Sequence, residues 1–172
     1  TDGSTHVWSE SSKGNVRDFT GMIDLASETL YFSALVRGYA GSTTGGASEA
    51  DLRFEFYDGA GATGKMRANV GITDGTLFAS DRDSGYRAGD TLVNAFFDDT
   101  TYLLVMKRTG SAIRASLITA DGNVGTIAAE PVGTWQVNEA GNSGSDLTSI
   151  RFLTNGDRDG GLRIDELRIA TD

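Results

Sequence analysis

The sequence predicts an all-β protein, folded as a two-sheet β-sandwich, and three observations lead to this prediction. Apolar and polar residues alternate in many short runs, which are bounded by clusters of Gly, Asp, Asn or Ser. The chain holds 23 glycines and a single proline, Pro131, which suits many tight turns. No segment has a convincing helical period. The 172 residues fit one domain, 1–172, in which 1–15 form a loose N-terminal segment or an edge strand.

The first strong alternation runs from Leu30 to Tyr39, with Arg37 and Tyr39 on the outward face. The cleanest alternation follows at 51–59. Its period of two predicts that one set of side chains points into the core and the other points out. The inward set is Leu52, Phe54 and Phe56, and the outward set is Arg53, Glu55 and Tyr57.

The later runs predict two hairpins. Residues 65–80 read as two strands around a turn at Asp74-Gly75, a strong hairpin signal. Residues 101–110 and 112–122 form the second pair, and the first of these strands is apolar on both faces, which predicts a central position. Residues 18–25 are expected to form a short turn or an edge strand, and 81–90 a polar loop.

Two strands, around 148–156 and 161–171, close the chain. In the last one the alternation changes phase at Asp165, because Leu162 and Ile164 share one face whereas Leu167 and Ile169 share the face of Asp165. Either a bulge intervenes or the strand is covered on both sides.

Charge and composition restrict the partners. The net charge is −9, from 15 basic and 24 acidic residues, and a field of this sign repels nucleic acid and anionic lipid. No apolar run approaches the ~20 residues of a membrane helix. Cysteine is absent, so there is no disulfide framework. We therefore expect no nucleic-acid or membrane partner, and a location outside the cell or on its surface, where calcium is available.

Three stretches carry a family resemblance: "LYFSALVRG", "TYLLVMKR" and the closing "GLRIDELRIA". Their order resembles the concanavalin-A-like lectin/glucanase superfamily, in particular laminin-G-like modules of secreted bacterial proteins, over about residues 16–171. The resemblance implies a jelly roll of two curved antiparallel sheets. Members bind glycans, mediate protein interactions or cleave polysaccharides, so the fold does not select among these functions.

A calcium loop is one interpretation of "NGDRDGGLRIDE". Asn155, Asp157 and Asp159 occupy the first three alternate ligand positions of the calcium-loop pattern, and Glu166 occupies the twelfth. A loop of this kind is flanked by helices, whereas both flanks here read as strands. The alternative is a hairpin in which Asn and Asp satisfy the turn geometry.

Asp165 is a second metal candidate. If it points inward, its carboxylate needs a partner, because an unpaired buried charge is too costly. The resemblance implies a structural calcium held by a carboxylate of the last strand and by groups near the N-terminus, with Asp18 or Asp24 as partners. A salt bridge to a neighbouring arginine is the alternative.

Motifs for catalysis are missing. The chain lacks the Glu-x-Asp-x-x-Glu string of one glycosidase family and the Gln-x-His pair of alginate-lyase jelly rolls. Its only histidine is His6, so histidine triads and multi-histidine zinc sites have little to draw on. We assign no catalytic residue.

Exposed aromatics beside arginines are the candidates for ligand binding, because sugar rings stack on aromatics and their hydroxyls bind polar groups. Such aromatics more often cap the core of a sandwich. If the arginines gather on one sheet face, they suit an anionic polysaccharide. The candidates are Arg37, Tyr39, Arg53, Tyr57, Tyr86, Arg87 and Trp135.

The leading hypothesis is a non-catalytic, lectin-like carbohydrate-binding module of a secreted bacterial protein, attached to other domains of its parent chain. One alternative is a structural or adhesive module of a large surface protein. The other is a polysaccharide lyase or glycoside hydrolase with an atypical active site.

Overall fold

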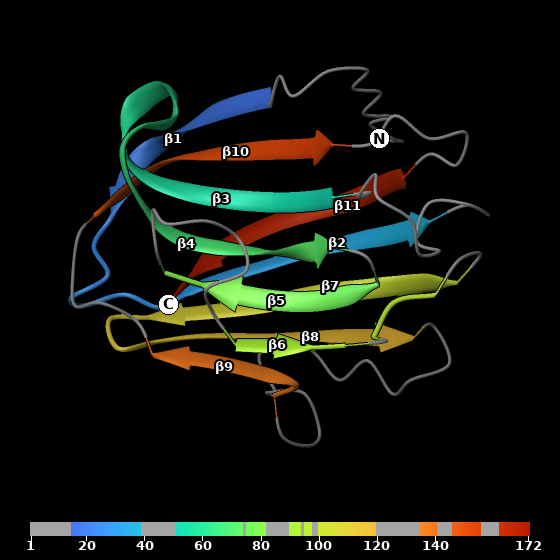
Figure 1. Ribbon diagram of the computed structural model, residues 1–172. Coiled ribbons are helices and arrows are strands. Elements are labelled where there is room, and N and C mark those ends of the chain that lie inside the picture. Colours follow the sequence, from blue (N-terminus) through green and yellow to red (C-terminus); the bar gives the residue numbers. More distant parts are fainter. Residues whose placement is uncertain are drawn as a thin grey trace.

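The protein folds as a sandwich of two antiparallel sheets that lie face to face (Figure 1), which confirms the predicted fold class. The computed structural model describes residues 15–38, 51–73, 75–81, 90–93, 95–97, 100–119, 135–140, 146–155 and 162–172. No helix among these residues has the length and apolar character needed to span a membrane.

Each sheet contains strands that are distant in the sequence. Sheet A has the order β1 (Asn15–Ile23), β10 (Leu147–Asn155), β3 (Asp51–Gly59), β4 (Thr63–Thr73), β5 (Thr76–Ser80) and β6 (Asp90–Leu92). Sheet B has the order β11 (Leu162–Thr171), β2 (Leu30–Gly38), β7 (Thr101–Thr109), β8 (Ala112–Thr119) and β9 (Val137–Ala140). A short 3-10 turn, η1 (Ala60–Ala62), connects β3 and β4.

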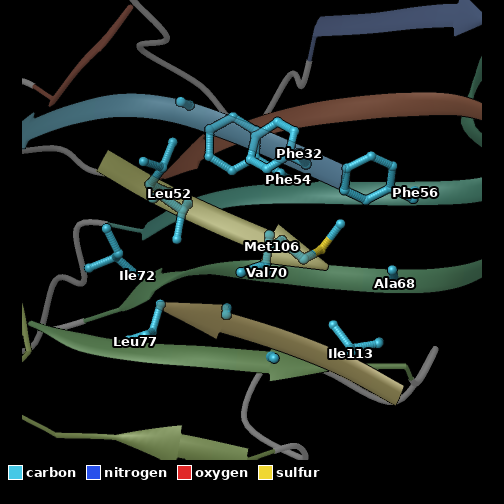
Figure 2. Close-up of a cluster of buried hydrophobic side chains, with 14 of the residues drawn as sticks. Phe32, Leu52, Phe54, Phe56, Ala68, Val70, Ile72, Leu77, Met106 and Ile113 are labelled. Atoms are coloured by element: carbon cyan, nitrogen blue, oxygen red, sulfur yellow. The ribbon is translucent and has the colours of Figure 1, made fainter. Parts of the chain in front are cut away.

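The core lies between the sheets and is built by the alternation seen in the sequence. The predicted inward residues Leu52, Phe54 and Phe56 are fully buried. The ring of Phe32 on β2 lies 4.6 Å from that of Phe54 and 5.6 Å from that of Phe56, centroid to centroid (Figure 2). These aromatic contacts join sheet B to sheet A, so they hold the two layers in register.

Both predicted hairpins are confirmed. β4 and β5 pair with Thr73 opposite Thr76, and Gly75 in the turn has a φ of +72°, a value that glycine adopts without steric cost. β7 and β8 pair with Thr109 opposite Ala112. β7 lies between β2 and β8, which is the central position predicted from its two apolar faces.

The edge strand predicted at 18–25 is β1, at one edge of sheet A. Its register with β10 is interrupted between Asp18 and Ile23. After Ile23 the chain turns at Asp24, whose carboxylate accepts hydrogen bonds from Ser27 Oγ (2.8 Å) and Ala26 N (2.9 Å). These two bonds lower the pKa of Asp24. The segment preceding Asn15 lies outside the described residues.

The closing strand β11 contains a bulge, one of the two explanations offered for its change of phase. Its register with β2 shifts between Asp165 and Arg168, and Glu166 has a φ of +51°. The bulge lets Ile164 and Ile169 both pack on the core. Asp165 is consequently exposed, so the inward orientation considered for its carboxylate is wrong.

One buried charge lies at the end of the core. Arg108, the last inward residue of β7, is 1% exposed. Its Nε donates to the carbonyl oxygen of Arg67 at 3.2 Å, and its guanidinium also donates to the carbonyl of Thr109. Burial lowers the pKa of Arg108. The guanidinium therefore closes this end of the core by binding backbone oxygens of both sheets.

Candidate functional site

The outer face of sheet A, directed away from the core, carries a row of polar side chains. Since Phe54 and Phe56 point inward, Glu55 points outward. The strand register places Glu55 opposite Arg151 of β10 and opposite Asn69 of β4. Asn69 in turn lies opposite Ser80 of β5. We call Arg151, Glu55, Asn69 and Ser80 the polar row. Three of its four members are buried, with 3%, 1% and 0% of Glu55, Asn69 and Ser80 exposed.

Glu55 is the hub of the polar row. Its Oε2 accepts hydrogen bonds from Tyr57 Oη at 2.8 Å and from Arg151 Nε at 2.6 Å, and Nη2 of Arg151 lies 2.5 Å away. The other oxygen, Oε1, lies 4.0 Å from Nη1 of Arg53. A buried carboxylate needs partners of this kind, and charge-assisted bonds are the strong ones.

The same contacts fix the surrounding side chains. The guanidinium carbon of Arg151 lies 5.2 Å from the centroid of the Tyr57 ring, a cation–π distance. The side chain of Arg151 is 34% exposed and that of Arg53 is 14% exposed. The arginines are thus the parts of this cluster that solvent, or a ligand, reaches first.

A second row runs beside the polar row and contains Arg53, Gly71 and Phe78. A Cβ added to Gly71 would lie 2.8 Å from Cζ of Phe78 and 2.1 Å from the carbonyl oxygen of Leu52. The Phe78 ring, 2% exposed, therefore lies across the glycine. Gly71 is what allows an aromatic ring to pack against the outer face at this point.

Polar contacts also anchor the η1 turn at one end of sheet A. Gly61 N donates to Asp18 Oδ1 at 2.6 Å, and Ala62 N donates to Ser149 Oγ at 3.0 Å. The hydroxyl of Ser149 donates in turn to the carbonyl of Gly59 at 2.7 Å. Asp18, considered above as a metal partner, here binds a backbone N–H that has no strand partner.

Asp58 closes the connection between β3 and β4. Burial alone would raise its pKa, but hydrogen bonds from Lys65 N and from the Arg67 side chain outweigh burial and lower the pKa of Asp58. Nε and Nη2 of Arg67 lie 2.8 and 2.7 Å from the same oxygen, Oδ2. Both contacts hold the turn in place beside the polar row.

The predicted ligand-binding residues divide between the two sheets. Arg53 and Tyr57 lie on the outer face of sheet A as predicted, but Tyr57 is only 8% exposed, so it is not the exposed stacking surface that was expected. Arg37 lies on β2 of sheet B. The arginines consequently do not all gather on one face.

Trp135 immediately precedes β9 and is half-buried. Its Nε1 is buried and has no hydrogen-bond partner among the described residues. Tyr39, Tyr86 and Arg87 lie outside the described residues.

Most of the metal candidates lie outside the described residues. Asp157 and Asp159 lie outside the described residues, as does the side chain of Asn155. Asp165 is exposed, and its Oδ1 accepts the Glu166 N–H at 2.8 Å. Within the described ranges no group of three or more His, Cys, Asp or Glu side chains is arranged to hold a metal ion.

Sequence reasoning missed Arg151, Asn69 and Ser80. The alternation of inward and outward residues does identify two of them. Arg151 stands between the inward residues Ile150 and Phe152, and Asn69 stands between Ala68 and Val70. The phase argument used for 51–59 places both on an outer face. What alternation does not give is the pairing β10-β3-β4-β5, which brings them beside Glu55.

Several solved structures share the fold of this chain at low sequence identity. No protein-family model matches the sequence, and no curated protein matches it. Among solved structures, lectin II from Ulex europaeus superposes with a TM-score of 0.60 at 7% identity, over 97% of this chain and 86% of the lectin. The carbohydrate recognition domain of Emp46p, in its metal-free form, gives 0.53 at 8% identity, over 92% of this chain and 77% of that domain.

The alginate lyase from Corynebacterium sp. gives a TM-score of 0.53 at 10% identity and covers 88% of this chain. This chain spans 62% of the length of that lyase. At such identities the likeness shows the fold alone. The protein has the jelly-roll fold that these lectins and the alginate lyase share, so the predicted fold is confirmed, while membership of the predicted superfamily stays a prediction.

Proposed function

We propose that the protein is a non-catalytic carbohydrate-binding module and that the outer face of sheet A is its binding surface. The observation that carries the proposal is the polar row, in which Arg151, Glu55 and Asn69 stand side by side on three neighbouring strands. The fold shared with lectins supports a carbohydrate-related function, and the chemistry of the row supports it independently.

The chemistry of the polar row suits a hydroxyl-rich ligand. Sugar hydroxyls both donate and accept hydrogen bonds, while arginine only donates and an ionised glutamate only accepts. Ion pairs with Arg151 and Arg53 hold the Glu55 carboxylate in one position before any ligand arrives. A site whose groups are already oriented loses less freedom on binding.

The more specific parts of this proposal come from the sequence. They are an anionic polysaccharide as ligand, a secreted bacterial parent with further domains, and a location outside the cell or on its surface. Arg53 and Arg151 on one face support an acidic ligand, although Glu55 between them reduces the net positive charge of the cluster.

Affinity electrophoresis through gels that contain alginate, polygalacturonate, mannan or laminarin tests the proposal. We expect at least one polymer to retard the protein. Arg151→Ala should weaken that retardation about tenfold or more, because it removes the most exposed donor of the cluster. Arg114→Ala, on the outer face of sheet B, is the matched control and should leave it unchanged. Absence of retardation on every polymer would favour the structural or adhesive alternative.

A structural calcium ion remains part of the proposal, either in the loop with Asn155, Asp157 and Asp159 as candidate ligands or at Asp165 of the last strand. Thermal melts in calcium and in chelator test it. A saturated site should stabilise the fold by about 2.7 kcal/mol at a hundredfold excess of calcium over its dissociation constant. An unchanged midpoint would remove calcium from the proposal.

A polysaccharide lyase is the second candidate. The observation that favours it is the meeting of the Tyr57 hydroxyl and the Arg151 guanidinium at one carboxylate oxygen, since a phenol can act as an acid or base and an arginine can neutralise a substrate carboxylate. Incubation with alginate should then release unsaturated ends, followed by ultraviolet absorbance. Binding without release supports the non-catalytic proposal.

A further inference from the structure

The polar row contains one acceptor without a hydrogen-bond donor among the described residues and, beside it, one acceptor with only a long ion pair. Asn69 is 1% exposed, and its Oδ1 accepts no hydrogen bond from any described residue. A buried amide oxygen without a donor is costly and requires an explanation in a native structure. The second acceptor is Oε1 of Glu55. The hydrogen bonds of this carboxylate from Tyr57 and Arg151 go to Oε2, whereas Oε1 lies 4.0 Å from Nη1 of Arg53.

The register sets the spacing of these two acceptors. Glu55 and Asn69 are direct partners across the antiparallel pair β3 and β4, so their Cβ atoms lie about 5 Å apart. Both side chains are on the outer face of sheet A. Two oxygens so placed can accept hydrogen bonds from two donors on adjacent atoms of one ligand. Two hydroxyls on neighbouring carbons of a sugar ring are donors of this kind.

Building on the proposed glycan-binding function, we propose that Glu55 and Asn69 recognise a vicinal diol, with one hydroxyl donating to Glu55 Oε1 and the adjacent hydroxyl to Asn69 Oδ1. The ligand class is a pyranoside that keeps two adjacent free hydroxyls. Arg151 and Tyr57 act as positioning residues, because they bind Oε2 and thereby leave Oε1 to the ligand. Asn69 Oδ1 is closed to solvent in the free protein, so binding at this atom requires the groups that cover it to move aside, which slows association.

Asn69→Leu tests the vacant acceptor without any ligand. Leucine has a similar shape and lacks the oxygen, so the melting temperature of the free protein should stay the same or rise. Asn138→Leu is the matched control, because Asn138 Oδ1 already accepts a hydrogen bond from Arg114 Nε at 3.1 Å, and its melting temperature should not rise. A clear fall in the melting temperature of Asn69→Leu would show that Oδ1 is already hydrogen-bonded in the free protein, by water, and would overturn the proposal.

Polysaccharides that differ in their diols test recognition. Mannan and alginate keep two adjacent ring hydroxyls, whereas in the backbone of laminarin the glycosidic bond occupies the middle one of three, so no adjacent pair remains. We expect mannan or alginate to retard the protein and laminarin not to, and periodate treatment, which cleaves vicinal diols, to abolish retardation. Asn69→Leu should weaken retardation about tenfold or more, and Asn138→Leu should not.

The outcomes separate the two proposals. If no polymer retards the protein, the glycan-binding function fails, and the melting experiment still decides whether Asn69 is a vacant acceptor. If laminarin retards the protein as strongly as mannan and alginate, or if Asn69→Leu binds like the unmodified protein, glycan binding stands and the diol proposal is overturned.

Discussion

The two outer faces of the sandwich differ in what they bury. On sheet A, the strongly buried outward residues include a carboxylate, an amide and a hydroxyl, those of Glu55, Asn69 and Ser80. On sheet B, the strongly buried outward residues are two hydroxyls and one apolar side chain, those of Ser33, Ser116 and Val105, which stand opposite one another on β2, β8 and β7. The neighbouring row of Leu35, Leu103 and Ile118 is half-buried. Both outer faces arise from the same alternation of inward and outward residues. The two faces therefore differ in which residue types occupy the outward positions.

Two contacts of charged groups on sheet B are longer or more exposed than those of Glu55. Lys107 Nζ lies 5.7 Å from the centroid of the Tyr31 ring, and Glu166 pairs with Arg168 where their side chains are 53% and 69% exposed. Exposed pairs of this kind contribute little to stability. A buried ion pair costs desolvation and seldom stabilises a fold more than apolar residues would. The Glu55 cluster is therefore better explained by a function than by stability.

We expect the largest loss of unfolding free energy for Glu55→Ala. This substitution leaves Arg151, Arg53 and the Tyr57 hydroxyl without their common acceptor, and breaking a buried pair from one side costs about 3 kcal/mol of unfolding free energy. Urea denaturation monitored by tryptophan fluorescence measures it. Arg114→Ala on sheet B should cost less than about 1 kcal/mol. Equal losses in the two variants would mean that the two faces do not differ as described.

Gly71→Ala should cause the second largest loss of unfolding free energy. The added Cβ would approach the Leu52 carbonyl oxygen and the Phe78 ring, and overpacking of this kind costs about 1–3 kcal/mol. Gly21→Ala is the control, because nothing lies within 4 Å of a Cβ at that edge-strand position. It should change the unfolding free energy by less than about 0.5 kcal/mol. A tolerated alanine at position 71 would show that the Phe78 ring is free to move away.

The smallest effect is expected for Glu166→Gln on β11. It removes an ion pair with Arg168 at 2.6 Å whose side chains are both exposed, so the loss should stay below about 0.5 kcal/mol. Thermal melts at low and at high salt measure it. A loss comparable to that of Glu55→Ala would contradict the distinction between a buried and an exposed pair.

Much of the fold could be predicted from the sequence, because alternation is a local property. The inward positions at 51–59, the turn at 74–75 and the change of phase at Asp165 were all visible as spacing. The direction of Asp165 was not, since a bulge with positive φ at Glu166 turns the carboxylate outward, and the residue types there do not distinguish a bulge from a strand covered on both sides.

The site was harder to predict, because it depends on pairing between strands that are distant in the sequence. Arg151 is 96 residues from Glu55 along the chain, and only the β10-β3 register brings them together. Arg37 and Arg53 are separated because β2 belongs to sheet B and β3 to sheet A, which the sequence could not show. The sequence also did not show which outward residues are buried. Tyr57 points outward as expected, but it is buried and its hydroxyl donates to Glu55.

Amide chemical-shift mapping during titration with an oligosaccharide of a retarding polymer tests the central claim most directly. The account predicts that the shifts concentrate on outward positions of sheet A, at Arg53, Glu55, Asn69 and Arg151, and spare Leu35, Leu103 and Ile118 on sheet B. Shifts confined to the outer face of sheet B, with sheet A unchanged at saturation, would contradict it.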